Sequence, residues 1–476
     1  MTTVSAEKSW RARAARPALL LVLLLAGCLE KHVVWSPDGS RAAVIARDGL
    51  YLCDTDGKLT PLLLPGVYQA AWLGDSQRLV VARKRKADSW TPIAAALGSE
   101  RAAAVVARAE ALWKKLEAGG AWGVLTKGDG EKKEPVILKV FLRERYGEAL
   151  RAKMGAGDWD ELKSKQVEIN ELVVARLEDG KIQPGTLLHE GLDEIRDIRV
   201  GRGDRFVAVT TNQAPDNDKE SRLLLVRIDV TGATAAAEHT AAYPDWTADG
   251  RSLVYVQASG ERTGNDDLRL ATLVQREVLN ADGQIKIAEK AEDLAGLYFQ
   301  DQTRVRCLRD GRILFNAAEF NLPVSVKDFG GDREKLFVLD LARQATLVRM
   351  IPRSEAEKMP KNLTFFEVGP DEKQVLVGGF DGEVSVLTLA SGDVDEVQQA
   401  GEYSLMGAPV WRNAEEITYA RRNPAVEGKN PSRKGEIVLR KVVLQKGDRE
   451  KVLSQDWSKE MLESVYGSSE NHPQGP

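Results

Sequence analysis

The sequence predicts an all-β fold made of repeated four-stranded units, a β-propeller. Residues 33–64 contain four short β-rich pieces, separated by tight-turn signals at 37–39, 48–49 and 56–57. Four consecutive strands with hairpin spacing are the pattern of one propeller blade. A strand, a turn centred on Asp and a second strand then recur along the chain, so we expect a ring of such units.

The turns of the repeats give the expected number of blades. The turn residues are Asp38, Asp75, Asp204, Asp249, Asp310, Asp371 and, in the most degenerate copy, Ala414. Successive turns lie 37 to 61 residues apart, apart from one interval of 129 residues. We therefore expect seven blades, with six or eight as alternatives because the long interval could hold further blades.

The long interval has the composition of helices. Residues 93–118 and 135–153 are rich in Ala, Leu, Glu, Lys and Arg, with apolar residues three to four positions apart. This spacing is typical of amphipathic helices. Strand patterns return at 171–177 and 186–189. We therefore predict a helical insertion at 87–168, between the second and third strands of blade two.

The N-terminus has the pattern of an export signal. Arg11, Arg13 and Arg16 precede an apolar run at 18–26, which small residues follow. A basic region, a short apolar region and small residues form a secretory signal peptide, here 1–27. The apolar run is about half of the ~20 residues that a membrane-spanning helix needs. Residues 28–32 would then be a short linker.

Residues 25–28, Leu-Ala-Gly-Cys, resemble the lipobox of bacterial lipoproteins. The resemblance implies that Cys28 is acylated and becomes the first residue after cleavage, which anchors the protein to the membrane. Leu29, in place of the Asp of inner-membrane lipoproteins, favours the outer membrane, with the protein facing the periplasm. A plain signal peptide is the alternative. Cys53 and Cys307 fall in different repeats, so we expect buried free thiols.

The repeats resemble the WD40-like (PD40) repeats of TolB-type propellers. Residues 35–39, Trp-Ser-Pro-Asp-Gly, match that pattern well, and the other copies keep two to four of its positions. We place the propeller at 33–456 and a polar C-terminal tail at 457–476. The resemblance implies a lipid-anchored envelope scaffold whose partners are envelope proteins near the membrane surface.

One rim of the propeller is expected to be elaborated. Connections between second and third strands lie on the same rim, and those at 212–221, 258–266, 318–333 and 422–435 are long. Variable loops on a rigid scaffold often carry function, which favours a partner-binding face there. The candidate residues are Arg83, Lys84, Arg85, Lys86, Trp90, Arg421 and Arg422. A solvated charge run is the alternative interpretation.

Composition excludes several functions. The chain has 67 Lys and Arg against 71 Asp and Glu, a net charge of −4, so no basic excess for nucleic acid exists. A single long apolar run excludes a protein with several membrane spans. Four His and three Cys provide little material for a metal site. The chain has no G-x-S-x-G motif. We expect neither enzymatic activity nor a cofactor or metal.

The central channel offers the alternative function. Arg196, Arg199, Arg304 and Arg306 lie on the expected inner strands of blades three and five. Those that face the channel could bind an anionic ligand, whereas the others would pack between blades. Small-ligand or glycan binding there, or an unrecognised hydrolase or lyase activity, remains open beside the scaffold function.

Overall fold

Antiparallel strands make up most of the structure, which is a computed structural model. It describes residues 31–467 except 121, 126–132, 179, 215–216, 241–242, 263–268, 300–302, 319–333, 342–347, 352–358, 361–362, 380–381, 400, 402, 424–434 and 445–449. The predicted signal peptide, Cys28 and the end of the predicted tail therefore lie outside the described residues, as do 263–266, 319–333 and 424–434 of the predicted long connections. The first part of the connection predicted at 258–266 is strand instead of loop.

The strands follow one another in groups of consecutive antiparallel neighbours. The first group contains β1 (Val33–Trp35), β2 (Arg41–Ala46), β3 (Gly49–Asp54) and β4 (Leu64–Pro65), and the second contains β5 (Val67–Trp72), β6 (Arg78–Ala87), β7 (Val167–Glu178) and β8 (Lys181–Gly191). The third contains β9 (Ile195–Val200), β10 (Phe206–Ala214), β11 (Asn217–Arg227) and β12 (Ala233–Thr240). The predicted loop at 212–221 is thus mostly strand, since β10 and β11 extend into it.

The remaining groups repeat this order. The fourth contains β13 (Asp245–Trp246), β14 (Ser252–Arg262), β15 (Arg269–Glu277) and β16 (Glu292–Phe299), and the fifth contains β17 (Val305–Cys307), β18 (Arg312–Ala318), β19 (Glu334–Asp340) and β20 (Val348–Ile351). The sixth contains β21 (Leu363–Val368), β22 (Gln374–Gly379), β23 (Val384–Thr388) and β24 (Val394–Gln398). The last contains β25 (Ser404–Leu405), β26 (Val410–Trp411), β27 (Glu416–Arg422), β28 (Ile437–Val443) and β29 (Glu450–Val452).

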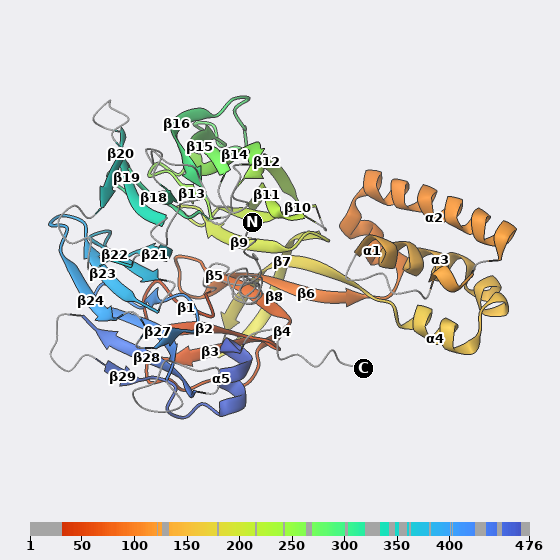
Figure 1. Ribbon diagram of the computed structural model, residues 1–476, viewed down its shortest axis with the longest axis horizontal. Helices are drawn as coiled ribbons and strands as arrows, with labels where there is room; N and C mark the ends of the chain where they lie inside the picture. Colours follow the sequence, from red (N-terminus) through yellow and green to blue (C-terminus); the bar gives the residue numbers. More distant parts are fainter. Residues whose placement is uncertain are drawn as a thin grey trace, which may run out of the picture.

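Apolar cores join each group to the next. Ala43 and Trp72 share a core between the first two groups, and equivalent clusters join every later pair within the described structure. Another cluster combines Val44 of the first group with Leu439 of the last, so the series closes on itself. Figure 1 shows the sheets arranged around a common centre. The third, fourth and fifth groups are also linked edge to edge, through single pairings of β12 with β14 and of β16 with β18. Stacked groups of four strands in a ring are the architecture of a β-propeller.

Tryptophans on the innermost strands tie neighbouring groups together. The indole Nε1 of Trp72 donates to the carbonyl of Val34, 2.8 Å away, in the group before it. Trp246 and Trp411 donate to the preceding inner strand in the same way. This repeated contact explains why Trp recurs before the turn: a buried indole N–H needs an acceptor, and the preceding strand supplies one.

In several repeats an Asp stabilises the turn that follows the inner strand. Asp75 Oδ1 accepts from the backbone N–H groups of Gln77 and Arg78, both at 2.9 Å. Asp249 and Asp310 accept from the residue two positions later in the same way. Such Asx turns satisfy backbone donors that the strands cannot pair.

The chain from Trp457 to Gly467 differs from the polar tail expected there. It contains helix α5 (Lys459–Tyr466), whose N-cap Ser458 accepts from the backbone of Met461. Trp457, Leu462, Val465 and Tyr466 are buried in the core that joins the first and last groups. The apolar residues at 462, 465 and 466 have helical spacing, so one face packs on the seam although the segment's composition is polar.

Helices occur consecutively between β6 and β7. They are α1 (Trp90–Leu97), α2 (Ser99–Gly119), a 3₁₀ turn at Trp122–Leu125, α3 (Lys133–Lys153) and α4 (Ala156–Ser164). Their core includes Trp113, whose ring stacks on Tyr146 at a centroid distance of 4.2 Å. Figure 1 shows them to one side of the sheets. No helix in the described part of the chain is long and apolar enough to cross a membrane.

We predict that Trp457→Ala lowers the free energy of unfolding by about 3 to 5 kcal/mol, because it empties a core site at the seam of the ring. Its indole Nε1 also donates to Gly57, 2.7 Å away. Trp457→Phe keeps an aromatic ring in the site but leaves the Gly57 carbonyl without this donor, so it should lose less, about 1–3 kcal/mol. Urea unfolding measures both variants. Equal, negligible losses would contradict a structural role for the segment.

We predict that a chain with residues 88–166 replaced by an Asn-Gly turn keeps a cooperative propeller. Ala87 of β6 pairs with Val167 of β7, so the two ends already lie opposite each other. The deletion uncovers Ile169 and Leu192, which pack against the helices, and we expect a lower unfolding midpoint. Calorimetry should still record one sharp transition. A broad, non-cooperative transition would show that the helices belong to the propeller core.

Candidate functional site: the central cavity

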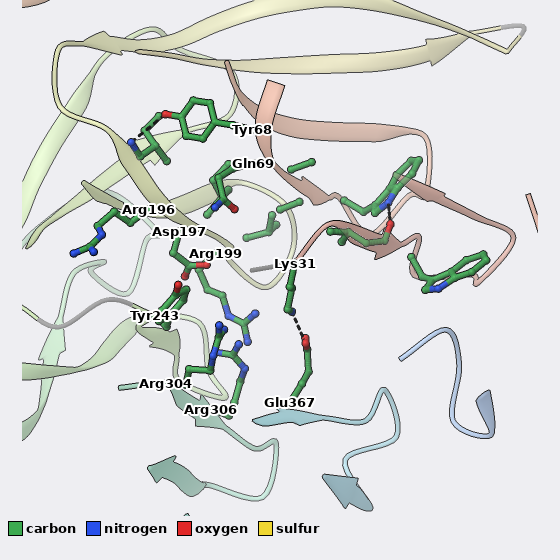
Figure 2. A pocket seen from close by; sticks show the side chains of 18 of the residues that line it. Lys31, Tyr68, Gln69, Arg196, Asp197, Arg199, Tyr243, Arg304, Arg306 and Glu367 are labelled. Atoms are coloured by element: carbon green, nitrogen blue, oxygen red, sulfur yellow. Dashed lines mark hydrogen bonds and ion pairs between the residues drawn. The ribbon is translucent and has the colours of Figure 1, made fainter. Parts of the chain in front are cut away.

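A cavity of about 580 Å³ lies at the centre of the ring. Its walls come from the inner strands of the first six groups and from the residues that precede them. The charged side chains that line it are Lys31, Arg196, Arg199, Arg304, Arg306, Glu194, Asp197 and Glu367. Segments far apart in the sequence therefore meet in one polar site (Figure 2).

Three guanidinium groups gather in this cavity. Arg199 extends from β9, Arg306 lies on β17, and Arg304 immediately precedes β17; Figure 2 shows their guanidinium groups close together. Arg199 Nε donates to Asp245 Oδ1 at 2.9 Å, and Asp245 Oδ2 accepts from the backbone N–H of Cys307 at 2.9 Å. Asp245 therefore holds Arg199 and β17 in place together.

Two aromatic rings fix Arg304. Its guanidinium carbon lies 3.9 Å from the centroid of the Tyr243 ring and 4.6 Å from that of Phe365. The side chain is only 3% exposed. Cation–π contacts replace part of the hydration that Arg304 loses on burial, and they restrict its rotamers.

Arg306 is buried with incomplete hydrogen bonding. It is 5% exposed, and its Nη1 donates to the carbonyl of Val305 at 2.7 Å. Its Nε has no hydrogen-bond partner within the described structure. Burial lowers the pKa of Arg306 to about 10, and repulsion from Arg199 contributes in the same direction. A buried donor without an acceptor costs about 1–3 kcal/mol, so a ligand that supplies one is favoured here.

Lys31 and Glu367 form an ion pair in the same cavity, with Nζ in contact with Oε2. Burial lowers the pKa of Lys31 to about 8; Glu367 opposes this shift, whereas Arg306, Arg304 and Arg199 add to it. Burial would raise the pKa of Glu367, but attraction to Lys31, Arg306 and Arg199 holds it at about 2. Both groups are therefore charged at neutral pH.

The cavity carries an excess of positive charge. Five cationic side chains and three carboxylates line it, which leaves two positive charges in excess. Repulsion among buried like charges is only weakly screened, because little water separates them. Chemically, this arrangement can bind an anion, orient it through guanidinium hydrogen bonds and exclude cations.

The structure brings together all four arginines that the sequence singles out for the channel. Arg196, Arg199, Arg304 and Arg306 line the same cavity, although Arg196 lies to one side in Figure 2. Their role in binding an anion stays a prediction. Sequence analysis missed Lys31, which it assigned to a linker, and Glu367 and Asp245. The signal that could have indicated Glu367 is the repeat pattern, which places it on an inner strand just before the turn of its own repeat.

The candidate partner-binding residues mostly have partners within the chain. Arg83 and Arg85 both pair with the buried Glu171, at 2.8 and 2.5 Å, and Lys84 pairs with Glu194 at 3.0 Å. Pairing between β6 and β7 therefore explains Arg83 and Arg85, and Lys84 pairs with a residue that immediately precedes β9.

The remaining candidate partner-binding residues lie in different surroundings. The ring of Trp90 packs edge-on against Phe141, and Arg421 lies 3.6 Å above the ring of Tyr403. Arg422 donates to the carbonyl of Gly435 at 3.3 Å, while Lys86 is exposed. Partner binding by this set stays a prediction.

The expected free thiols are confirmed, since Cys53 and Cys307 are both buried and unpaired with each other. Burial raises the pKa of each thiol, which makes both unreactive. Among the described residues, no group of three or more His, Cys, Asp or Glu side chains is placed to hold a metal ion.

No protein-family model matches the sequence, and no curated protein matches it either. Among solved structures, the chain is similar to TolB from Acinetobacter baumannii, with 15% identity, 58% of this chain and 57% of TolB covered, and a TM-score of 0.35. It is similar to the β-propeller domain of the Trilobed protease from Pyrococcus furiosus, with 11% identity, coverage of 60% and 87%, and a TM-score of 0.36.

A third similar structure is prolyl oligopeptidase B from Galerina marginata, with 9% identity, 89% of this chain and 49% of that chain covered, and a TM-score of 0.49. The structural neighbours thus include both TolB and enzymes. At these values the propeller fold rests on the strand order and shared cores of the chain itself. The expected lack of enzymatic activity stays a prediction.

We predict that Glu367→Gln lowers the free energy of unfolding by about 2 kcal/mol at pH 7, because the half-buried Lys31 loses its carboxylate partner. The depressed pKa of Glu367 stabilises the folded state above pH 4.5, and this contribution is lost as the pH falls toward 2. The difference between wild type and variant should therefore shrink over that range in urea titrations.

Glu178→Gln is the matched control. Glu178 pairs with Arg176 at 3.5 Å on the surface, with a side chain 56% exposed. Such an exposed pair contributes about 1 kcal/mol at most. Equal effects of the two substitutions would contradict a special role for the cavity carboxylate.

Proposed function

We propose that this protein binds a small anionic ligand in the central cavity of its propeller. The observation that carries the proposal is the cluster of Arg199, Arg304 and Arg306, gathered in one cavity. In particular, the buried Arg306 has a donor without a partner in the described structure. A protein that needed these side chains only for packing would gain stability from apolar residues in their place.

The cluster is held in position before any ligand arrives. Asp245 orients Arg199, and the rings of Tyr243 and Phe365 hold Arg304. Guanidinium groups fixed in this way lose little conformational entropy on binding, so more of the interaction energy becomes affinity. The planar fork of Arg suits carboxylate, phosphate and sulfate oxygens alike.

We also propose that the strand groups are the seven blades of a single propeller at 33–456, built from PD40-like repeats. The repeated Trp contacts and Asx turns support this assignment. The helices between β6 and β7 would then be an insertion in blade two, at 87–168. Each blade would contribute its inner strand to the channel.

We propose that Cys28 is lipidated after removal of the signal peptide 1–27, and that the protein hangs from the outer membrane into the periplasm. The support is the sequence pattern at 25–28. Only Leu29 and Glu30 separate Cys28 from Lys31, which lines the cavity. Three Cα–Cα steps span about 11 Å at most, so the cavity would lie near the lipid surface.

A second candidate function is a scaffold that binds envelope proteins on the rim that carries α1 to α4. These helices have a core of their own and stand to one side of the sheets. Cross-linking followed by purification from membranes would compare the full chain with the variant in which an Asn-Gly turn replaces residues 88–166. A partner captured only by the full chain supports the scaffold, and identical empty results from both forms contradict it.

We predict that at least one of acetate, phosphate and sulfate, at constant ionic strength against chloride, raises the melting temperature of the wild type. A ligand at 100 times its Kd stabilises the fold by about 2.7 kcal/mol. Arg306→Gln should abolish the shift, because it removes a cationic donor that lines the cavity. Arg176→Gln, at an exposed site, should keep it. No shift with any anion would contradict the proposed function.

A further inference from the structure

We propose that Tyr68 couples the central cavity to the helices between β6 and β7, so that anion binding in the cavity and the stability of these helices affect each other. This inference rests on the proposed function and adds the regulation of the same site. It starts from the segment 192–195, which packs against the helices at its beginning and lines the cavity at its end.

The helices hold the first half of this segment. Leu192 is fully buried in a core that includes Ile93 of α1 and Val140 of α3. A carboxylate oxygen of the next residue, Asp193, lies 3.7 Å from Nη1 of Arg101 on α2. Helices α1, α2 and α3 therefore all meet the short connection between β8 and β9.

The second half of the segment belongs to the wall of the cavity. Glu194 and Ile195 line the cavity, and the lining continues without a break through β9 to Val200. Arg199 of the guanidinium cluster lies in this stretch. The register of β9 against β10 shifts between Asp197 and Ile195. Regular strand pairing is interrupted there, so the position of the start of β9 depends on further contacts.

Tyr68 supplies such a contact. It lines the cavity from β5, and its hydroxyl accepts from the backbone N–H of Ile195 at 3.1 Å (Figure 2). The same hydroxyl donates to Oδ1 of Asn170 on β7 at 2.9 Å. Burial raises the pKa of Tyr68, so the hydroxyl keeps the proton that it donates.

Asn170 connects this tyrosine to the residue buried under the helices. It is 1% exposed, and its Nδ2 donates to the carbonyl of Leu192 at 3.2 Å. Opposite Asn170 on the hairpin that carries the helices lies Lys84. Its Nζ is 3.0 Å from Oε1 of Glu194 and 5.2 Å from the centroid of the Tyr68 ring. The hairpin thus contacts the cavity wall through both hydrogen bonds and a charge.

This network makes the order of the wall and the order of the helices interdependent. A buried hydrogen-bonding group is costly to leave without a partner, so the members of the network keep their arrangement together. An anion that orders the wall would therefore also stabilise the helices. Intact helices would in turn strengthen anion binding by the same factor, because the coupling of two equilibria is reciprocal.

Titration calorimetry tests the coupling. The probe is whichever of acetate, phosphate and sulfate raises the melting temperature of the wild type most. We expect the chain with an Asn-Gly turn in place of 88–166 to bind it at least about fivefold more weakly. All the cationic side chains that line the cavity are still present in that shortened chain. In the full chain, Tyr68→Phe should weaken binding by about threefold or more.

The combination of the two changes separates coupling from direct contact with the anion. In the shortened chain, Tyr68→Phe should cost little further affinity, because the helices whose effect Tyr68 transmits are already absent. Equal losses in both chains would show that Tyr68 acts on the anion directly, and would overturn the coupling. Tyr419→Phe is the matched control and should bind like the wild type. Its hydroxyl donates to Glu450 at 2.9 Å, and it is not among the residues that line the cavity.

Hydrogen exchange measures the reciprocal effect in the full chain. At a saturating concentration of the probe, the backbone amides of α1 and α3 should exchange more slowly in the wild type. This protection should be smaller in Tyr68→Phe, at a concentration that saturates the variant. Urea unfolding confirms that each variant is folded, and hydrogen exchange alone decides if the shortened chain does not fold.

The outcomes separate the two proposals. Equal affinity of the wild type and the folded shortened chain would overturn the coupling and leave anion binding intact. Exchange in α1 and α3 that the probe leaves unchanged would do the same. No binding of any of the three anions to the folded wild type would overturn the proposed function, and the coupling with it.

Discussion

The apolar contact between the first and last strand groups determines whether the central cavity exists. Each group stacks on its neighbours, but only the core shared by Val44, Leu439 and the residues of α5 closes the series. Arg199, Arg306 and Glu367 come from three different groups, so their mutual distances depend on that closure. A seam that opened would separate the charges and fill the space between them with water. Packing at the periphery thus maintains the electrostatics at the centre.

The cavity itself conflicts with the stability of the ring. Several cations in one buried space repel each other, and Arg306 retains an unsatisfied donor in the described structure. The protein offsets this cost locally through Asp245, Glu367 and the rings that flank Arg304. Natural proteins usually keep such conflicts where function requires them, because packing alone would select against them. The site therefore differs in kind from the ion pairs around Glu171, where charges are balanced.

Local patterns predicted the fold well. Asp-centred turns and alternating strands depend on nearby residues, and both are read directly from short windows of sequence. The helical stretch was equally clear, because its apolar spacing persists over several turns. The four arginines could be assigned to inner strands for the same reason. Two predictions from local patterns were wrong. Helix α5 was missed because its polar composition concealed an apolar face. The loop expected at 212–221 is mostly strand, because β10 and β11 extend into it.

The composition of the cavity could not be predicted in full, since it depends on contacts between distant segments. Lys31 and Glu367 lie more than 300 positions apart, and nothing near either residue indicates the other. Asp245 could be recognised as part of a repeat, yet its pairing with Arg199 depends on how the third and fourth groups stack. Such pairs form only when the repeats pack into a ring, so patterns within single repeats cannot predict them.

The ring contact between His32 and Tyr466 brings the two ends of the described chain together. Their rings lie 5.3 Å apart, so the segment before β1 and the end of α5 are in contact. No strand of the described structure crosses this seam, since every group is built from consecutive strands. The ring is therefore fastened by side-chain packing and by a backbone hydrogen bond from Arg47 to Ser464, rather than by an exchanged strand. Topologically the fold has no privileged starting point, and a chain rejoined here and opened at another surface loop would encode the same ring.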